Sequence, residues 1–299
     1  MDERKLFEFM CACKSLVSLT FDDGRGEQYS KFYPILDEND LKATFYIVTE
    51  RINWKGFMGW DELRTLHKDG NEIGSHTHTH PHLATLSNDE LDFEFKKSHD
   101  ILRIFNCCTL AYPYGEYNEK IVDHAKQYFI AARGYYDSNI GSKDPEANLD
   151  LNQDRFKLKT FPIEHTIQSP ATEVLQNYPL FALPFSKFKQ TLKELIEYNT
   201  KRKAWIIFTF HGHYTWKNIS WVFRKPKETV ERLAVRITKR SSTQNFARRN
   251  VLTKDKMLKF KWMCEFFAQN DQTEVLPVSQ VIKKHLVCPE KSLRTTLYK

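Results

Sequence analysis

Four histidines lie within seven residues of this sequence, which makes the segment GSHTHTHPHL a candidate metal site. They are His76, His78, His80 and His82. Imidazoles are common metal ligands, and two of them four residues apart can reach one ion where a strand turns into a loop. The run by itself leaves open which of the four bind metal, because a polar loop with incidental imidazoles has the same pattern.

Two adjacent carboxylates occur earlier in the chain, in the segment TFDDG. Asp22 and Asp23 directly follow the apolar run Leu16–Phe21. One of them is free to bind a metal while the other handles protons, and histidine plus carboxylate ligation with an open position is typical of hydrolytic metal sites. Since a solvated turn would also explain TFDDG alone, the interpretation depends on a fold that brings the two segments together.

Short apolar runs alternate with helix-like segments along most of the chain. Strands are expected at LVSLTF, KATFYIV, NEIGS, TLAYP, IAARG, FKLKTFPI, AWIIFTF and EVLPV, with helices between them. This alternation favours an α/β fold with a parallel sheet, and seven or eight such units in one domain indicate a closed or nearly closed barrel.

Reactive side chains follow the ends of five of the expected strands. They are Asp22 and Asp23, His76, Tyr112–Gly115, Arg133 and His211. Parallel α/β barrels build their active sites at the C-terminal ends of the strands. Five strand ends that meet at one face therefore predict a catalytic site more specifically than any single motif.

The composition is that of an ordinary globular protein. The chain has 299 residues, 41% hydrophobic and 28% charged, which excludes a disordered chain. No apolar run approaches the ~18 residues of a membrane span, and the start MDERKLFEFMCACKSL lacks the apolar core of a signal peptide. Six cysteines form no obvious disulfide framework. We therefore expect a cytoplasmic protein with reduced thiols.

The stretch from Lys217 to Lys256 is strongly basic. It holds twelve lysines and arginines against three acidic residues and overlaps an irregular insertion expected at about 214–253. A solvated insertion and a contact for an anionic partner, such as a phosphate on a linked sugar or a lipid surface, both fit this pattern.

In its motifs the chain resembles the polysaccharide deacetylases of carbohydrate esterase family 4, which share the NodB-homology fold. TFDDG at 20–24, HTHTH at 76–80, YPYG at 112–115 and His211 after a late strand stand in the family's order. The resemblance covers about Ser15 to Phe210 well and the last helix and strand weakly. It implies a single catalytic domain over residues 1–299 with a distorted (β/α)7-8 barrel.

The resemblance also implies the metal ligands and the catalytic groups. Asp23, His76 and His80 would hold a divalent metal, Zn²⁺ or in its place Co²⁺, Mn²⁺ or Ni²⁺, so that His78 and His82 are not ligands. The catalytic groups would be Asp22 as general base, His211 as general acid for the leaving amine, and the backbone N–H of Tyr114 as a donor to the oxyanion.

Two departures from the family pattern concern residues that support the catalytic groups. The arginine that holds the catalytic aspartate in the family is replaced by Ala111, and we predict that Arg133 takes its place beside Asp22. The family's aspartate that supports the acid histidine has no clear match, and Asp137 and Asp154 are the candidates.

These residues together predict a metal-dependent hydrolase that removes an acetyl group from an N-acetylated sugar or oligosaccharide. A deformylase, an O-acetyl esterase and a non-sugar amidase on the same fold are alternatives. A non-catalytic module that binds nucleic acid or an acidic surface through Lys217–Lys256 would leave the catalytic set unexplained.

Overall fold

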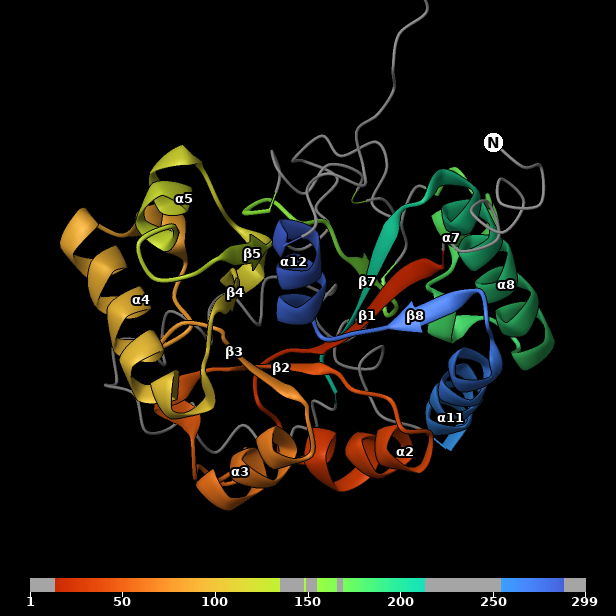
Figure 1. Ribbon diagram of the computed structural model, residues 1–299, viewed down its shortest axis with the longest axis horizontal. Helices are drawn as coiled ribbons and strands as arrows, with labels where there is room; N and C mark the ends of the chain where they lie inside the picture. Colours follow the sequence, from red (N-terminus) through yellow and green to blue (C-terminus); the bar gives the residue numbers. More distant parts are fainter. Residues whose placement is uncertain (1–13, 135–147, 149–154, 166–168, 213–253, 288–299) are drawn as a thin grey trace, which may run out of the picture.

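The computed structural model describes residues 14–134, 148, 155–165, 169–212 and 254–287 (Figure 1). The insertion expected at about 214–253 lies outside the described residues, so its architecture stays a prediction. Among the described residues, none of the helices combines the length and the apolar character needed to cross a membrane.

Eight parallel strands form the centre of the described structure. In the sheet they follow the order β5-β4-β3-β2-β1-β7-β6, and β8 pairs with β1. Their bounds are β1 Ser15–Phe21, β2 Thr44–Ile47, β3 Glu72–Ser75, β4 Thr109–Ala111, β5 Ala131–Arg133, β6 Phe161–Pro162, β7 Trp205–Phe210 and β8 Thr273–Val275. The strands β1 and β7 pair over six residues, from Leu16↔Trp205 to Phe21↔Phe210, and both are apolar runs buried along their length.

The sheet curls into a distorted barrel. A bridge between Arg133 and Leu158 joins β5 to the segment that leads into β6, and Phe161 of β6 pairs with Phe208 of β7. Two strands pair with the same edge of β1. The strand β8 pairs with its beginning, from Ser15, and β2 pairs with its end. The expected α/β barrel is confirmed. The strand expected over FKLKTFPI shortens to Phe161–Pro162, because the preceding residues form only bridging contacts.

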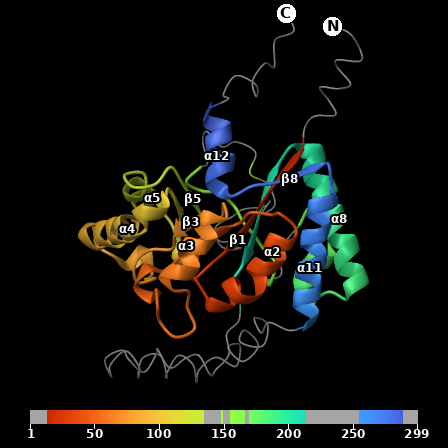
Figure 2. The ribbon, with the colours of Figure 1, turned by 60° about the horizontal axis from the view of Figure 1, so that its bottom comes forward.

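Helices surround the barrel (Figures 1 and 2). Their bounds are α2 Tyr33–Glu38, α3 Trp60–Lys68, α4 Asn88–Leu102, α5 Glu119–Ala125, α7 Val174–Asn177, α8 Phe185–Arg202, α11 Lys254–Gln269 and α12 Val278–Val287. Shorter helical turns are η1 Gln28–Phe32, η2 Thr49–Arg51, η3 Leu83–Thr85, η4 Arg103–Phe105, η5 Pro113–Gly115 and η7 Leu180–Ala182. A capping box formed by Ser87 and Glu90 begins α4.

The helix α12 was not expected from the sequence. Its first N–H groups bond to side chains where β2 and β3 begin: Val278 donates to Thr44 Oγ1 at 2.9 Å and Ser279 to Glu72 Oε2 at 2.8 Å. In Figure 1 it lies over the middle of the strand ring. Its start is therefore fixed at the N-terminal end of the barrel, which leaves the C-terminal end for the site.

Phenylalanines fill the space between β1 and its neighbours. The ring of Phe21 stacks on Phe45 of β2 and Phe210 of β7 at centroid distances of 4.9 and 5.0 Å, and Phe260 of α11 meets it edge-on. All four side chains are buried. The last residues of β1 and β7, which carry Asp22 and His211 just beyond them, are thus held by one aromatic cluster.

Candidate active site

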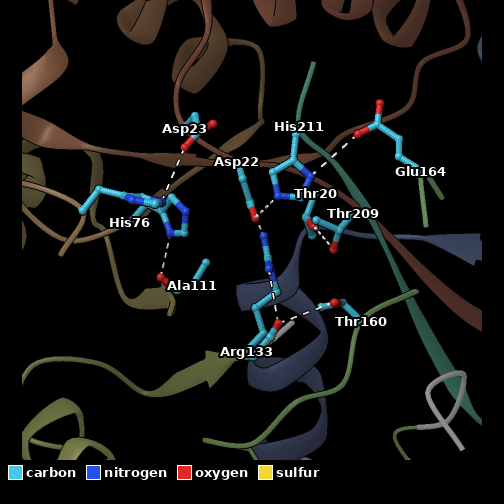
Figure 3. A network of polar contacts seen from close by, with 12 residues as sticks. Thr20, Asp22, Asp23, His76, Ala111, Arg133, Thr160, Glu164, Thr209 and His211 are labelled. Carbon is cyan, nitrogen blue, oxygen red and sulfur yellow. Dashed lines mark hydrogen bonds and ion pairs between the residues drawn. The ribbon is translucent and has the colours of Figure 1, made fainter. Parts of the chain in front are cut away.

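The side chains singled out in the sequence do gather at the C-terminal ends of the parallel strands. Asp22 and Asp23 follow β1, His76 follows β3, Arg133 is the last residue of β5, and His211 follows β7 (Figure 3). Parallel pairing puts all these strand ends at one edge of the sheet. The fold therefore brings the TFDDG and HTHTH motifs together, as the expected strand ends predict.

Asp23, His76 and His80 form a compact group of metal-ligand atoms. One ligand atom from each lies within 4.8 Å of the other two, and His80 Nε2 is 3.6 Å from Asp23 Oδ1. In a tetrahedral site with bonds of about 2.0–2.2 Å, ligand atoms stand roughly 3.4 Å apart. Both aspartate and histidine suit a divalent metal such as zinc, so the residues present fit such an ion.

A backbone hydrogen bond assigns the tautomer of His76. Its Nδ1 lies 2.7 Å from the carbonyl oxygen of Ala111, which can only accept, so Nδ1 carries the proton and Nε2 keeps its lone pair. Such a partner on the far ring nitrogen is the usual way in which a metal-binding histidine is oriented. Ala111 thus contributes through its backbone at the position where the related family has arginine.

The electrostatics of the cluster favour metal binding. Burial lowers the pKa of His80 to about 3 and also lowers the pKa of His76, so both imidazoles are neutral near pH 7. Burial alone would raise the pKa of Asp23, but neighbouring charges, Arg25 and Arg51 among them, bring it well below its usual range. Neutral imidazoles and an ionised carboxylate are the forms that bind a metal.

Arg25 and Arg51 were not expected from the sequence. Arg25 Nε lies 3.7 Å from Asp23 Oδ2 and Arg51 Nη1 3.6 Å from Oδ1, and both guanidinium groups face the ring of Phe57. Both arginines are buried. They hold the Asp23 carboxylate from two sides, which restricts its rotation.

The loop after β3 adopts unusual backbone conformations to present its histidines. Thr77 and His80 have positive φ values of 65° and 66°, as Asp23 does at 75°. The N–H of His80 donates to Thr77 Oγ1 at 3.1 Å, and Glu94 of α4 accepts from the N–H groups of His78 and Thr79 at 2.8 Å each. These bonds hold the loop in a shape that sterics alone disfavour.

The other two histidines of the run point to other partners. His78 Nδ1 lies 2.8 Å from Thr49 Oγ1. His82 Nδ1 lies 2.9 Å from Glu116 Oε1, and its ring stacks on Tyr114 with centroids 4.0 Å apart. Neither contributes to the cluster of ligand atoms found among the described residues.

Asp22 lies between a cation and an imidazole. The guanidinium of Arg133 donates a hydrogen bond to Asp22 Oδ1, and both side chains are buried. His211 Nε2 lies 3.7 Å from Asp22 Oδ2. The ion pair predicted between Arg133 and Asp22 is present (Figure 3). The Arg133 guanidinium also stacks over the ring of Tyr46 at 4.5 Å, which fixes its direction.

The carboxylate beside His211 comes from Glu164, which the sequence analysis missed. Glu164 Oε2 lies 3.8 Å from His211 Nδ1. The candidates Asp137 and Asp154 lie outside the described residues. Glu164 follows β6 by two positions, so the rule that located the other groups, a polar residue just past a strand end, would have found it too.

Tyr114 lies at the rim of the cluster. Its backbone is left-handed, with φ 59°, and its ring meets His80 edge-on with centroids 4.7 Å apart. The side chain is half exposed. The part assigned to its backbone N–H, donation to an oxyanion, stays a prediction.

Gln28 joins the backbones that carry Asp22 and His211. Its buried amide donates to the carbonyl oxygens of both residues, and its Oε1 accepts from the N–H of Arg25 at 3.1 Å. Sequence patterns did not single out this residue, because its role depends on two distant strands.

Replacing Gln28 by leucine is expected to lower turnover more than it lowers metal affinity. The change leaves buried carbonyls without a donor, at a cost of roughly 1–3 kcal/mol each, and loosens the spacing of Asp22 and His211. Urea unfolding, metal titration and acetate release measure the three effects. Gln190→Leu, on the exposed side of α8, is the control. A folded Gln28→Leu protein with unchanged turnover would contradict the assigned role.

These features define an α/β barrel protein with a candidate metal site at the C-terminal ends of its strands. Residues 10–132 match the family model described as polysaccharide deacetylase. In this stretch, which is less than half of the chain, the sequence is similar to that family.

Relatives with similar sequences carry related names. A chitin deacetylase of Colletotrichum lindemuthianum is 31% identical over 143 residues, which are 46% of this chain and 56% of that protein. A peptidoglycan-N-acetylglucosamine deacetylase of Bacillus cereus is 34% identical over 90 residues, 30% of this chain and 31% of that protein. The matched regions thus span less than two thirds of these relatives.

Among solved structures, the peptidoglycan deacetylase PdaC of Bacillus subtilis aligns with a TM-score of 0.48 at 15% identity. The alignment covers 93% of this chain and 95% of that one. The deacetylase PplD of Streptococcus pyogenes aligns with a TM-score of 0.44 at 24% identity, over 53% of this chain and 71% of that one.

Proposed function

We propose that the protein is a metal-dependent hydrolase that removes the acetyl group from an N-acetylated sugar or oligosaccharide. The observation that carries the proposal is the arrangement around Asp22. This buried carboxylate lies between Arg133 and His211, and the next residue, Asp23, belongs to the three-ligand cluster. A base, an acid and a metal site thus stand side by side, as hydrolysis of an amide requires.

Each residue has a distinct part in this reaction. A divalent metal, zinc by preference and otherwise cobalt, manganese or nickel, would be held by Asp23, His76 and His80 and would supply Lewis acidity. Asp22 accepts the proton of the attacking water. His211 then protonates the nitrogen, which cannot leave as an anion, and the backbone N–H of Tyr114 donates to the oxyanion.

An acetate-release assay tests this function. Purified protein is incubated with added Zn²⁺ and three substrate sets: N-acetylglucosamine oligomers, phosphate-linked N-acetyl sugars, and matched O-acetyl, N-formyl and non-sugar amide compounds. Release from the N-acetyl sugars at the highest kcat/KM is expected. A preference for the last set would replace the proposal by an esterase, deformylase or amidase.

The phosphate-linked substrates also test whether the basic stretch attracts an anionic group on the substrate. An anionic group on the sugar would be attracted by the positive charges between Lys217 and Lys256. Reversing four of the arginines in this stretch is then expected to raise KM for the phosphate-linked sugar and to leave the neutral oligomer unchanged.

Replacing Arg133 by alanine is expected to lower turnover about 10–100-fold while the metal stays bound. The guanidinium donates a hydrogen bond to the Asp22 carboxylate and holds it in place, so its loss should lower kcat with little change in KM. Arg133→Lys should recover part of the rate, and Arg64→Ala, at an exposed surface pair, is the control. An unchanged kcat in a folded Arg133→Ala protein would rule out this part for Arg133.

A further inference from the structure

A row of alternating charges crosses the C-terminal end of the barrel. His211 stands in its middle, between Asp22 on the Nε2 side and Glu164 on the Nδ1 side (Figure 3). Arg133 pairs with Asp22 beyond one end of the row. At the other end, Lys256 Nζ lies 3.9 Å from Glu164 Oε1. Each of the two carboxylates beside the imidazole therefore also contacts one cation: Asp22 contacts Arg133, and Glu164 contacts Lys256.

The Glu164 carboxyl group is buried, so its ionised form is unfavourable without positive charge nearby. Its side chain is 8% exposed. Burial raises its pKa, while the charges of His211 and Lys256 and a hydrogen bond from the His211 backbone oppose that rise. Within the described residues, its buried Oε2 atom has no hydrogen-bond partner, and this is the oxygen nearest His211 Nδ1. A small closure of the site would complete a bond between these two atoms.

Lys256 does not behave as a solvated residue of the basic stretch. It lies in the first turn of α11 with its side chain 13% exposed, and burial lowers its pKa. Lys254, two residues earlier, is exposed. Burial of an ammonium group is unfavourable unless a carboxylate compensates it; Glu164 is the larger of two such influences on Lys256, and Asp255 is the other.

The helix α11 is anchored to the segment that carries Glu164. Lys259, one turn after Lys256, donates to the carbonyl oxygen of Phe181 at 3.0 Å, and the N–H of Phe181 donates to the carbonyl oxygen of Ile163 at 3.1 Å. Ile163 directly precedes Glu164. One side-chain bond and one backbone bond therefore link α11 to the segment that carries the carboxylate beside His211.

We propose that Lys256 is a positioning residue, which holds the Glu164 carboxylate against the His211 ring and so orients the imidazole that donates the proton to the departing nitrogen. The inference rests on the proposed deacetylation, because that reaction makes His211 the acid. It assigns Lys256, the last lysine of the basic stretch, to the site.

The direct test follows the Glu164 carboxyl carbon by NMR as the pH is varied, with its signal assigned through Glu164→Gln. No substrate is needed. The ionisable groups around it are His211 from the end of β7 and Lys256 from α11, with Asp22 and Arg133 beyond His211. In Lys256→Gln the carboxyl should titrate at higher pH, because a cation that favours the carboxylate is gone.

Lys256→Arg keeps the charge and should keep the wild-type titration, and Lys254→Gln is the matched charge-loss control on the same helix. If Lys256→Gln is unstable, Lys256→Met serves in its place. An unchanged Glu164 titration in the charge-loss variant would overturn the proposal.

A double-mutant cycle of Lys256 and Glu164, measured as kcat, is the second test. Lys256→Gln should lower kcat about 10-fold with little change in KM, and the same substitution in the Glu164→Gln background should have no further effect. Effects that multiply independently would overturn the proposal. If the wild-type protein releases acetate from no substrate, the proposed function fails, and the titration still decides whether Lys256 supports Glu164.

Discussion

Asp22→Asn is expected to abolish turnover while the protein keeps its metal. Asparagine has the shape of aspartate but cannot accept the proton of the attacking water, and loss of a general base costs about 10²–10⁴-fold in rate. Asp23, His76 and His80 are untouched by this change, so metal content measured by elemental analysis should stay at the wild-type level. Acetate release gives the rate.

The buried pair with Arg133 makes a folding control necessary. Asp22→Asn leaves the guanidinium without its carboxylate, and breaking a buried pair costs about 3–5 kcal/mol. The double variant Asp22→Asn, Arg133→Met removes both charges and should be inactive with improved stability. Asp40→Asn, at an exposed position, should behave as wild type. Near-normal turnover of a folded, metal-loaded Asp22→Asn protein would exclude Asp22 as the base.

The second large effect is expected in the zinc affinity of variants of the histidine run. Two of the four histidines should be needed for zinc binding and the other two should not. His76→Ala and His80→Ala each remove one of the three proposed ligands and should weaken zinc binding by more than the roughly 10–100-fold that loss of an outer partner costs. His78→Ala and His82→Ala should bind zinc as wild type does, because their rings contact Thr49 and Glu116 instead.

Competition with a chromophoric chelator measures the affinity of each variant, and the four substitutions are matched controls for one another. Asp23→Ala should resemble His80→Ala. Loss of zinc in His78→Ala with retention in His80→Ala would show that the ligand assignment is wrong.

The strand-end groups were predictable because parallel pairing is a strong constraint. A polar residue directly after a parallel apolar strand lies at the C-terminal end of the barrel. Asp22, His76 and His211 could therefore be predicted to lie close together from the sequence. The ion pair of Arg133 with Asp22 followed from the same constraint together with the resemblance, in which an arginine holds the catalytic aspartate. The resemblance to a known family then assigned a part to each of them.

Other site residues depend on contacts that leave no local pattern. Gln28 and Arg51 lie in short helical turns, and each acts on the site only through the direction of its side chain in the folded chain. Glu164 differs from these residues, because it directly follows the expected strand FKLKTFPI and the strand-end rule applies to it. The helix α12 was missed because its start is stabilised by Thr44 and Glu72, more than two hundred residues earlier.

The left-handed residues of the site set a limit on how stable this protein can become. Asp23, Thr77, His80 and Tyr114 hold positive φ values, and conformations of this kind cost on the order of 1–3 kcal/mol each. Selection for thermostability alone would favour glycine at these positions. It would replace Asp23 and His80, two of the proposed metal ligands, and the β-branched residue Thr77. Stability and activity are therefore expected to trade against each other in these loops.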